Sequence, residues 1–184
     1  MSLINFLEVC KEESLNIFKE HSGNPVVTFI ETDKNFDRSQ NSWNSLIFIG
    51  GSKFNFMFQA EFTTIHLLSL ASDRFSDVNE TDYIDHVKDF MREFCNLFAG
   101  KLKACFETKT DAFLSLPIIT REYDIEKIFD TPLDQLSSLS WKIGDGKMAI
   151  SLKGYYHEKE KFGDYEFIQN HLKDRTKRSE IDFF

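Results

Sequence analysis

Cysteine is scarce in this sequence, and the few cysteines present form no recognisable pattern. Only Cys10, Cys95 and Cys105 occur among 184 residues, and no CxxC spacing links any two of them. An odd number of widely spaced cysteines favours neither a disulfide framework nor a zinc site. We therefore expect a protein that works in a reducing compartment, the cytoplasm.

Basic residues and long apolar runs are scarce as well. The chain has 22 Lys and Arg against 30 Asp and Glu, a formal net charge of -8, and no basic stripe stands out before the C-terminal tail. Nucleic-acid binding requires a basic surface, so we expect no nucleic-acid partner. No apolar run approaches the ~18 residues that span a bilayer, and the first residues lack the features of an export signal, so we expect no membrane insertion.

Sequence motifs for metals and nucleotides are absent. The five histidines never adopt HExxH or a similar ligand spacing, and neither the GxxxxGKS/T nor the GxGxxG motif occurs. These motifs are the local sequence signals of zinc, nucleotide and dinucleotide sites. Their absence predicts no metal site and no cofactor of the protein's own.

What the sequence does contain is typical of one soluble globular domain. Hydrophobic residues make up 41% and charged residues 28% of the chain, and the 20 phenylalanines are spread along its whole length. Such a spread indicates core filling and not a localised binding cluster. From residue 155 onward the composition becomes strongly charged, so we predict a domain over 1–154 and a charged C-terminal extension over 155–184.

Hydrophobic periodicity and turn residues predict an α+β fold, with a mostly antiparallel sheet of about six strands and an N-terminal helix and a long helix packed on it. Pro117 predicts a sheet edge, a bulge or a strand start where it occurs. Gly-rich segments predict two hairpin turns. The predicted elements are helices over 3–20, 62–70 and 80–106, the last capped by Asn79, a helical turn over 124–129, a loop over 72–78, and strands over 26–30, 46–49, 54–58, 113–120, 139–143 and 147–152.

The long helix has two different faces. At ~100° per residue, its apolar side chains fall within a narrow arc that must face the core. The opposite arc carries Asp89, Glu93, Asn96 and Gly100. On spacing alone, the ordinary solvated face of an amphipathic helix is the favoured interpretation of these four residues. The apolar stripe comprises Ile84, Val87, Met91, Phe94, Phe98, Leu102 and Cys105.

Asn96 and Gly100 weaken that ordinary interpretation. Both residue types lower the stability of a helix interior relative to alanine, glycine by about 1 kcal/mol. A glycine one turn beyond Asn96 also bares the helix backbone, so that another surface can approach closely. The two residues together therefore indicate a docking site on this face.

Residues 93–102 resemble the active-site helix of the CheC/CheX chemotaxis phosphatases. The pattern of that family is Asp or Ser, three residues, Glu, two residues, Asn, and then about twenty residues to a Pro. Asp89, Glu93, Asn96 and Pro117 fill these positions. The order of predicted elements is similar to that of the family over residues 3–152, and residues from 155 onward are an addition to it.

The resemblance implies a phosphatase that removes the phosphoryl group from the aspartyl-phosphate of a CheY-like response regulator, which supplies its own Mg²⁺. By this resemblance Asn96 orients the attacking water and Glu93 pairs with the active-site lysine of the regulator, with the use of Glu93 as a general base ranked second. Asp89 supports these residues, and Gly100 provides clearance for the regulator. Family members of the single-site kind are similar in pairing, so the resemblance also implies a homodimer.

Two alternatives remain open at the level of sequence. Glu13 and Asn16 repeat the Glu-x-x-Asn spacing in the first helix, and some family members resemble this in carrying two active helices. However, Val9 stands where the pattern has Asp or Ser, and no proline follows at the later spacing. The other alternative is a non-catalytic module of the same fold that binds a regulator or assembles in signalling.

Overall fold

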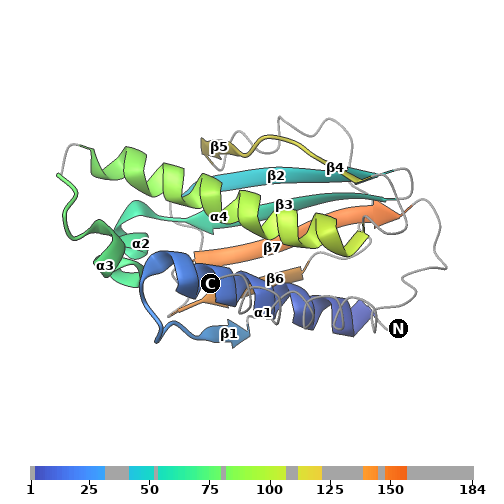
Figure 1. The fold of residues 1–184 in the computed structure, drawn as a ribbon, viewed down its shortest axis with the longest axis horizontal. Helices are drawn as coiled ribbons and strands as arrows, with labels where there is room; N and C mark the ends of the chain where they lie inside the picture. The colour runs from blue at the N-terminus through green and yellow to red at the C-terminus, as the bar shows by residue number, and fades with distance from the viewer. Residues whose placement is uncertain are drawn as a thin grey trace, which may run out of the picture.

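The structure is a computed structural model that describes residues 3–31, 42–51, 54–79, 82–106, 112–121, 139–144 and 148–156. It confirms the α+β fold, with an antiparallel sheet of seven strands where about six were predicted (Figure 1). The additional strand arises because the proline-containing segment forms two strands. The elements are α1 (Leu3–Ser22), β1 (Phe29–Glu31), β2 (Trp43–Gly51), β3 (Phe54–Phe62), α2 (Thr64–Leu70), α3 (Ser72–Phe75), α4 (Tyr83–Phe106), β4 (Ala112–Leu114), β5 (Ile118–Arg121), β6 (Leu139–Ile143) and β7 (Met148–Tyr156).

The sheet is built from two hairpins joined side by side. Its strand order is β1-β6-β7-β3-β2-β4, β5 pairs with β2 as well, and every pairing is antiparallel. Ile47 pairs with Phe58 in the β2–β3 hairpin, and Ile143 pairs with Met148 in the β6–β7 hairpin. Gly144, which follows β6, has φ of 69°, a conformation that glycine adopts without steric cost.

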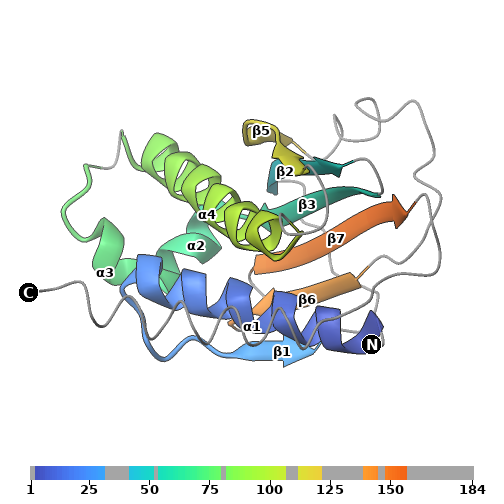
Figure 2. The same ribbon diagram turned by 45° about the vertical axis from the view of Figure 1, so that its right-hand side comes forward.

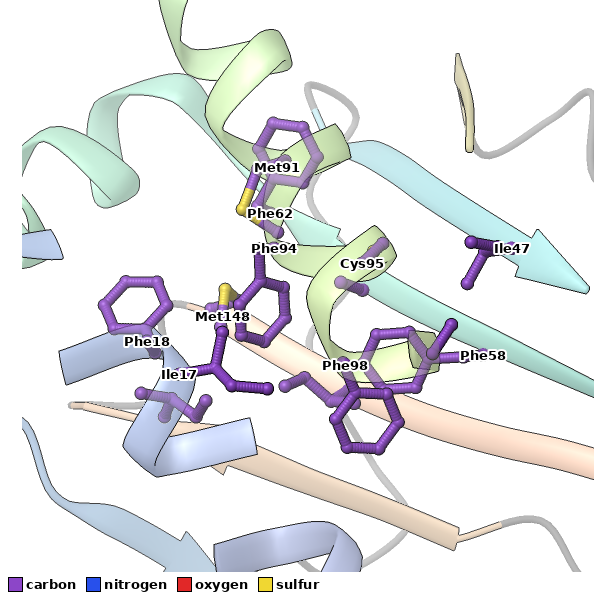
Figure 3. Close-up of a cluster of buried hydrophobic side chains, with 14 of the residues drawn as sticks. Ile17, Phe18, Ile47, Phe58, Phe62, Met91, Phe94, Cys95, Phe98 and Met148 are labelled. Carbon is purple, nitrogen blue, oxygen red and sulfur yellow. The ribbon is translucent and has the colours of Figure 1, made fainter. Parts of the chain in front are cut away.

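The helices α1 and α4 lie across the same face of the sheet, and both views show them side by side (Figures 1 and 2). The core fills the space between these helices and the sheet, and phenylalanine dominates it (Figure 3). The rings of Phe58 on β3 and Phe98 on α4 are stacked with their centroids 3.9 Å apart. Phe18 on α1 meets Phe94 on α4 edge to face, with centroids 5.9 Å apart. The prediction that the phenylalanines fill the core is therefore confirmed for these residues.

Pro117 lies at a bulge on the edge of the sheet, which fits two of the three settings predicted for it from the sequence. Leu114 of β4 pairs with Ile49 of β2, and Ile118 of β5 pairs with Leu46. The two pairings are three residues apart along β2 but four residues apart along the edge segment. The edge segment therefore contains one extra residue, which defines a β-bulge. The Ser115 hydroxyl accepts a hydrogen bond from the backbone N–H of Phe48 at 2.9 Å, which replaces a regular ladder bond there.

Four local predictions differ from the structure. The helix predicted over 62–70 begins at Thr64, because Phe62 still belongs to β3. The predicted loop over 72–78 contains α3, whose four residues are too few to show a helical period, and which the buried Phe75 ties to the core. The long helix begins at Tyr83, so Asp82 precedes it and Asn79 does not cap it. The predicted strand over 26–30 is displaced to Phe29–Glu31.

Other predicted boundaries concern the C-terminal part of the chain. The last strand, β7, ends at Tyr156, two residues beyond the predicted domain boundary at 154. The rest of the charged extension and the predicted turn over 124–129 lie outside the described residues. Among the helices that the structure describes, none combines the length and the apolar character needed to cross a membrane.

Candidate functional site

The outer face of α4 presents the four predicted site residues together. Asp89, Glu93 and Asn96 are exposed, and Gly100 is partly exposed. The same helix buries Phe94 and Phe98 completely on its inner face. The prediction that packing and the candidate chemistry occupy opposite faces of this helix is therefore confirmed, while the roles of the four residues stay predictions.

The buried stripe of α4 is wider than periodicity predicted. Phe90, Cys95 and Ala99 are buried in addition to the predicted residues, because α1 and the sheet contact the helix from two directions. Ile84, in contrast, was predicted to be buried and is 46% exposed. Figure 1 shows the reason, since the first turn of α4 extends past the ends of the strands. Cys105 lies in the last turn, where the structure gives no side-chain description.

The charged residues of the motif face are partnered within the chain. Asp89 forms an ion pair with Arg92, one turn along the same helix. Glu93 Oε1 lies 3.8 Å from His21 Nδ1 on α1, with 49% and 32% of the two side chains exposed. The Asn96 side chain makes no hydrogen bond to another residue that the structure describes. Its amide is therefore available, among the described residues, to bind water or a partner.

The packing of α1 on α4 fixes which residues meet across the two helices. Phe18 contacts both Phe90 and Phe94, at ring-centroid distances of 5.7 and 5.9 Å. Farther along, Lys101 Nζ forms an ion pair with Glu13 Oε2 at 2.9 Å. Because residue 13 meets residue 101 and residue 21 meets residue 93, the helices run antiparallel.

This arrangement bears on the second Glu-x-x-Asn spacing. The Glu13 side chain is only 16% exposed and is already paired with Lys101, whereas Glu93 is 49% exposed. Asn16 is exposed, as Asn96 is, and Val9, which stands at the Asp or Ser position of the pattern, is buried. The asparagine is therefore exposed in both Glu-x-x-Asn segments, whereas the glutamate is largely buried in the first segment and half exposed in the second.

On the side of α4 that faces the sheet edge, the Trp43 ring makes two cation–π contacts. Lys88 Nζ lies 4.5 Å from the centroid of the Trp43 ring, and Arg121 Cζ lies 4.9 Å from it. These cation–π contacts link α4, β2 and β5, and β4 and β5 of the edge segment that contains Pro117 both contact the motif helix. Trp43 and His21 were not predicted from the sequence, because both act across large separations in the chain.

Cys95 is buried directly beneath the motif face. Its Sγ donates to the backbone carbonyl of Ser45 at 3.6 Å, and burial raises the pKa of the Cys95 thiol to about 12, although hydrogen bonds oppose the increase. A thiol that stays protonated is a poor nucleophile. Cys10 is also fully buried. Neither cysteine is a candidate for nucleophilic chemistry.

The raised pKa of Cys95 predicts a loss of stability at high pH. The thiol of the unfolded chain ionises above its ordinary pKa of 9.0, while the folded thiol stays protonated up to about 12. The unfolded state therefore binds fewer protons in this range, and the free energy of unfolding falls by at most about 1.4 kcal/mol per pH unit. Denaturation curves measured between pH 8 and 11 should show that the free energy of unfolding falls more steeply with pH for the parent than for Cys95→Ala. The raised pKa of Tyr83 acts in both proteins, so equal slopes would contradict the assignment to Cys95.

The described part of the chain contains no group of three or more His, Cys, Asp or Glu side chains arranged to hold a metal ion. The exposed motif side chains are instead a carboxylate and an amide, Glu93 and Asn96, three residues apart on one helix. The Glu93 carboxylate can pair with a cationic side chain, and the Asn96 amide can hydrogen-bond and orient a water molecule.

Comparisons with known proteins identify the fold. No family model matches the sequence, and no curated protein matches it either. A chain in the solved CheX–CheY–BeF₃–Mg²⁺ complex from Borrelia burgdorferi superposes with a TM-score of 0.54 and 16% identity, covering 82% of this chain and 97% of that one. A CheC-like superfamily protein from Shewanella sp. PV-4 gives 0.54 and 13%, covering 84% and 99%. Chemotaxis protein CheX from Vibrio vulnificus gives 0.50 and 14%, covering 78% and 99%. The chain therefore has the fold of the CheC/CheX-like chemotaxis proteins.

Proposed function

We propose that this protein is a phosphatase that hydrolyses the aspartyl-phosphate of a CheY-like response regulator. The observation that carries the proposal is the joint exposure of Glu93 and Asn96 on the outer face of α4. The solved complex of a CheX from Borrelia burgdorferi with CheY supports a partner of the same kind for this chain. The regulator supplies the Mg²⁺, and the cytoplasm is the proposed location.

Asn96 is the residue that orients the attacking water. Its side-chain amide offers both a donor and an acceptor, and it is not occupied by another described residue. Phosphoryl transfer passes through a loose transition state, so most of the acceleration comes from placing water in line with the leaving group and from neutralising charge. An exposed amide on a rigid helix can do the first of these without a covalent step.

Glu93 holds the regulator in register, and Asp89 supports it. Glu93 is half exposed and can form a charge-assisted contact with the active-site lysine of the regulator. Asp89 supports the face through its ion pair with Arg92. A role for Glu93 as a general base ranks second, and it predicts that Glu93→Gln lowers kcat while a docking role predicts that it raises KM.

The test is a dephosphorylation assay with a phosphorylated CheY-like regulator and Mg²⁺. Stoichiometric to excess protein should accelerate the loss of phosphate over the regulator alone. Binding of the regulator without acceleration would favour the alternative of a non-catalytic module. Absence of both binding and acceleration, across regulators that share a genome with this protein, would reject a role in regulator signalling.

Gly100 predicts a substitution that improves folding and impairs docking. Outside the adjoining helix backbone, a Cβ added at Gly100 meets no atom of a described residue within 4 Å, so the described fold does not need glycine there. Gly100→Ala should therefore raise the free energy of unfolding by up to about 1 kcal/mol. In the assay it should raise KM severalfold with little change in kcat, because the methyl group opposes close approach of the regulator. An unchanged KM would exclude Gly100 from the docking surface.

We also propose a homodimer. The β4–β5 edge of the sheet exposes Phe113, Leu116 and Ile118, and an apolar edge is a surface that proteins cover. Pairing of two copies along this edge would cover it in both. Light scattering at micromolar concentration should give twice the mass of the 21.6 kDa chain. Leu116→Lys, on an 84% exposed side chain, should shift that mass toward the monomer, and a parent that is already monomeric would contradict the proposal.

A further inference from the structure

We infer that His21 on α1 is a positioning residue that holds the Glu93 carboxylate toward α1 and so keeps the Asn96 amide open to water. The inference rests on the proposed function for its catalytic consequence. It adds a residue from another helix, outside the Asp89, Glu93, Asn96 and Pro117 pattern. The contact that motivates it is the 3.8 Å approach of His21 Nδ1 to Glu93 Oε1.

Buried packing sets the place of His21. Phe18, one turn before His21 on α1, is fully buried and packs edge to face against Phe90 and Phe94 of α4. Glu93 directly precedes Phe94, so the same contact that anchors the two helices brings the imidazole beside the carboxylate. The Glu13–Lys101 ion pair joins the helices at the other end of this segment. The core, and not a surface loop, therefore fixes the relative position of the two helix segments that carry His21 and Glu93.

Without His21, Asn96 is a polar neighbour to which the Glu93 carboxylate can turn on its own helix. Residues three apart on a helix are neighbours, with Cβ atoms about 5–6 Å apart, and the Asn96 amide can donate a hydrogen bond to the Glu93 carboxylate. That bond would occupy the amide which is proposed to hold water. In the structure the Glu93 carboxylate lies on the α1 side instead, and Asn96 has no side-chain hydrogen bond to a described residue.

The first test needs no partner protein. NMR of the full chain should detect the side-chain amide signals of Asn96, assigned by their loss in Asn96→Ala. These signals should shift in His21→Leu, which keeps bulk and removes the ring nitrogens, and should return toward the parent positions in His21→Gln, whose amide can reach Glu93. The double variant His21→Leu with Glu93→Ala should also restore them. Signals that do not move in His21→Leu would overturn the inference, whatever the phosphatase assay shows.

The second test measures the catalytic consequence. His21→Leu should lower kcat for regulator dephosphorylation about two- to fivefold, because the expected side-chain contacts are weak ones at a surface. His21→Gln should recover most of that loss. Glu13→Gln serves as the control, since Glu13 also joins α1 to α4 but contacts Lys101, and it should not reproduce the effect. An equal loss in Glu13→Gln would show a general structural role for α1 and overturn the positioning role. If the parent shows no phosphatase activity, the proposed function fails and the NMR result alone decides the inference.

Discussion

Replacing Asn96 with alanine should lower the rate of regulator dephosphorylation by about 100-fold or more. The loss of one oriented hydrogen-bonding group at a reacting centre typically has this effect. Asn96 is exposed and no described residue depends on its side chain, so the variant should remain folded. Alanine is also the better helix former, so the free energy of unfolding should stay equal or rise by a few tenths of a kcal/mol. Stopped-flow or radiolabel assays would measure the rate of dephosphorylation, and denaturation curves would measure the free energy of unfolding.

Asn16→Ala is the matched control for this experiment. Asn16 is likewise an exposed asparagine three residues after a glutamate on a long helix, but that glutamate, Glu13, is held by Lys101. We expect Asn16→Ala to keep the parent rate, and Asn96→Ala combined with Asn16→Ala to match Asn96→Ala alone. A comparable loss in both single variants would establish two working sites. Full activity in Asn96→Ala would reject the water-orienting role of that residue.

Replacing Phe94 with alanine should lower the free energy of unfolding by about 3–5 kcal/mol. The Phe94 ring is fully buried and contacts the rings of Phe18 and Phe58, so its removal leaves a cavity where α1, α4 and β3 meet (Figure 3). Since small domains have a total stability of about 5–15 kcal/mol, the variant should be near the limit of folding at ambient temperature. Urea denaturation followed by circular dichroism is the measurement.

Ile65 supplies the comparison for a large apolar residue outside the core. It lies on α2 and is 77% exposed, so Ile65→Ala should change the free energy of unfolding by no more than about 0.5 kcal/mol. A loss for Phe94→Ala that is as small as the change for Ile65→Ala would mean that α1 and α4 are not packed through this ring. The assignment of His21 to its place beside Glu93 would then lose its support as well.

The motif face could be predicted from the sequence because the signal is local. Helical periodicity depends on neighbouring residues of one segment, and α4 is long enough, at 24 residues, for that period to be clear. The Gly-rich turns and Pro117 also act locally, and they correctly indicated the hairpins and the bulge at the sheet edge. Local signals therefore gave both the α+β fold and the shared exposure of Glu93 and Asn96.

What could not be predicted depends on where elements meet in space. Ile84 has the right period for the core, and its exposure follows from the length of α4 relative to the strands beneath it. The contact of His21 with Glu93 joins residues that are far apart in the chain, and Trp43 meets Arg121 across a similar separation. Side-chain contacts between distant elements have no counterpart in the local periodicity of either segment.

The open space around Gly100 has a consequence for how proteins of this fold diverge. A side chain at position 100 would contact no described residue beyond its own helix, so this position places little demand on folding, and the exposed position 96 is similarly unconstrained. Substitutions on the outer face of α4 can therefore accumulate in a lineage without loss of a folded protein. For the proposed phosphatase, a form that hydrolyses the aspartyl-phosphate and a form that only binds the regulator can therefore differ by a single codon, and overall sequence identity will not distinguish them.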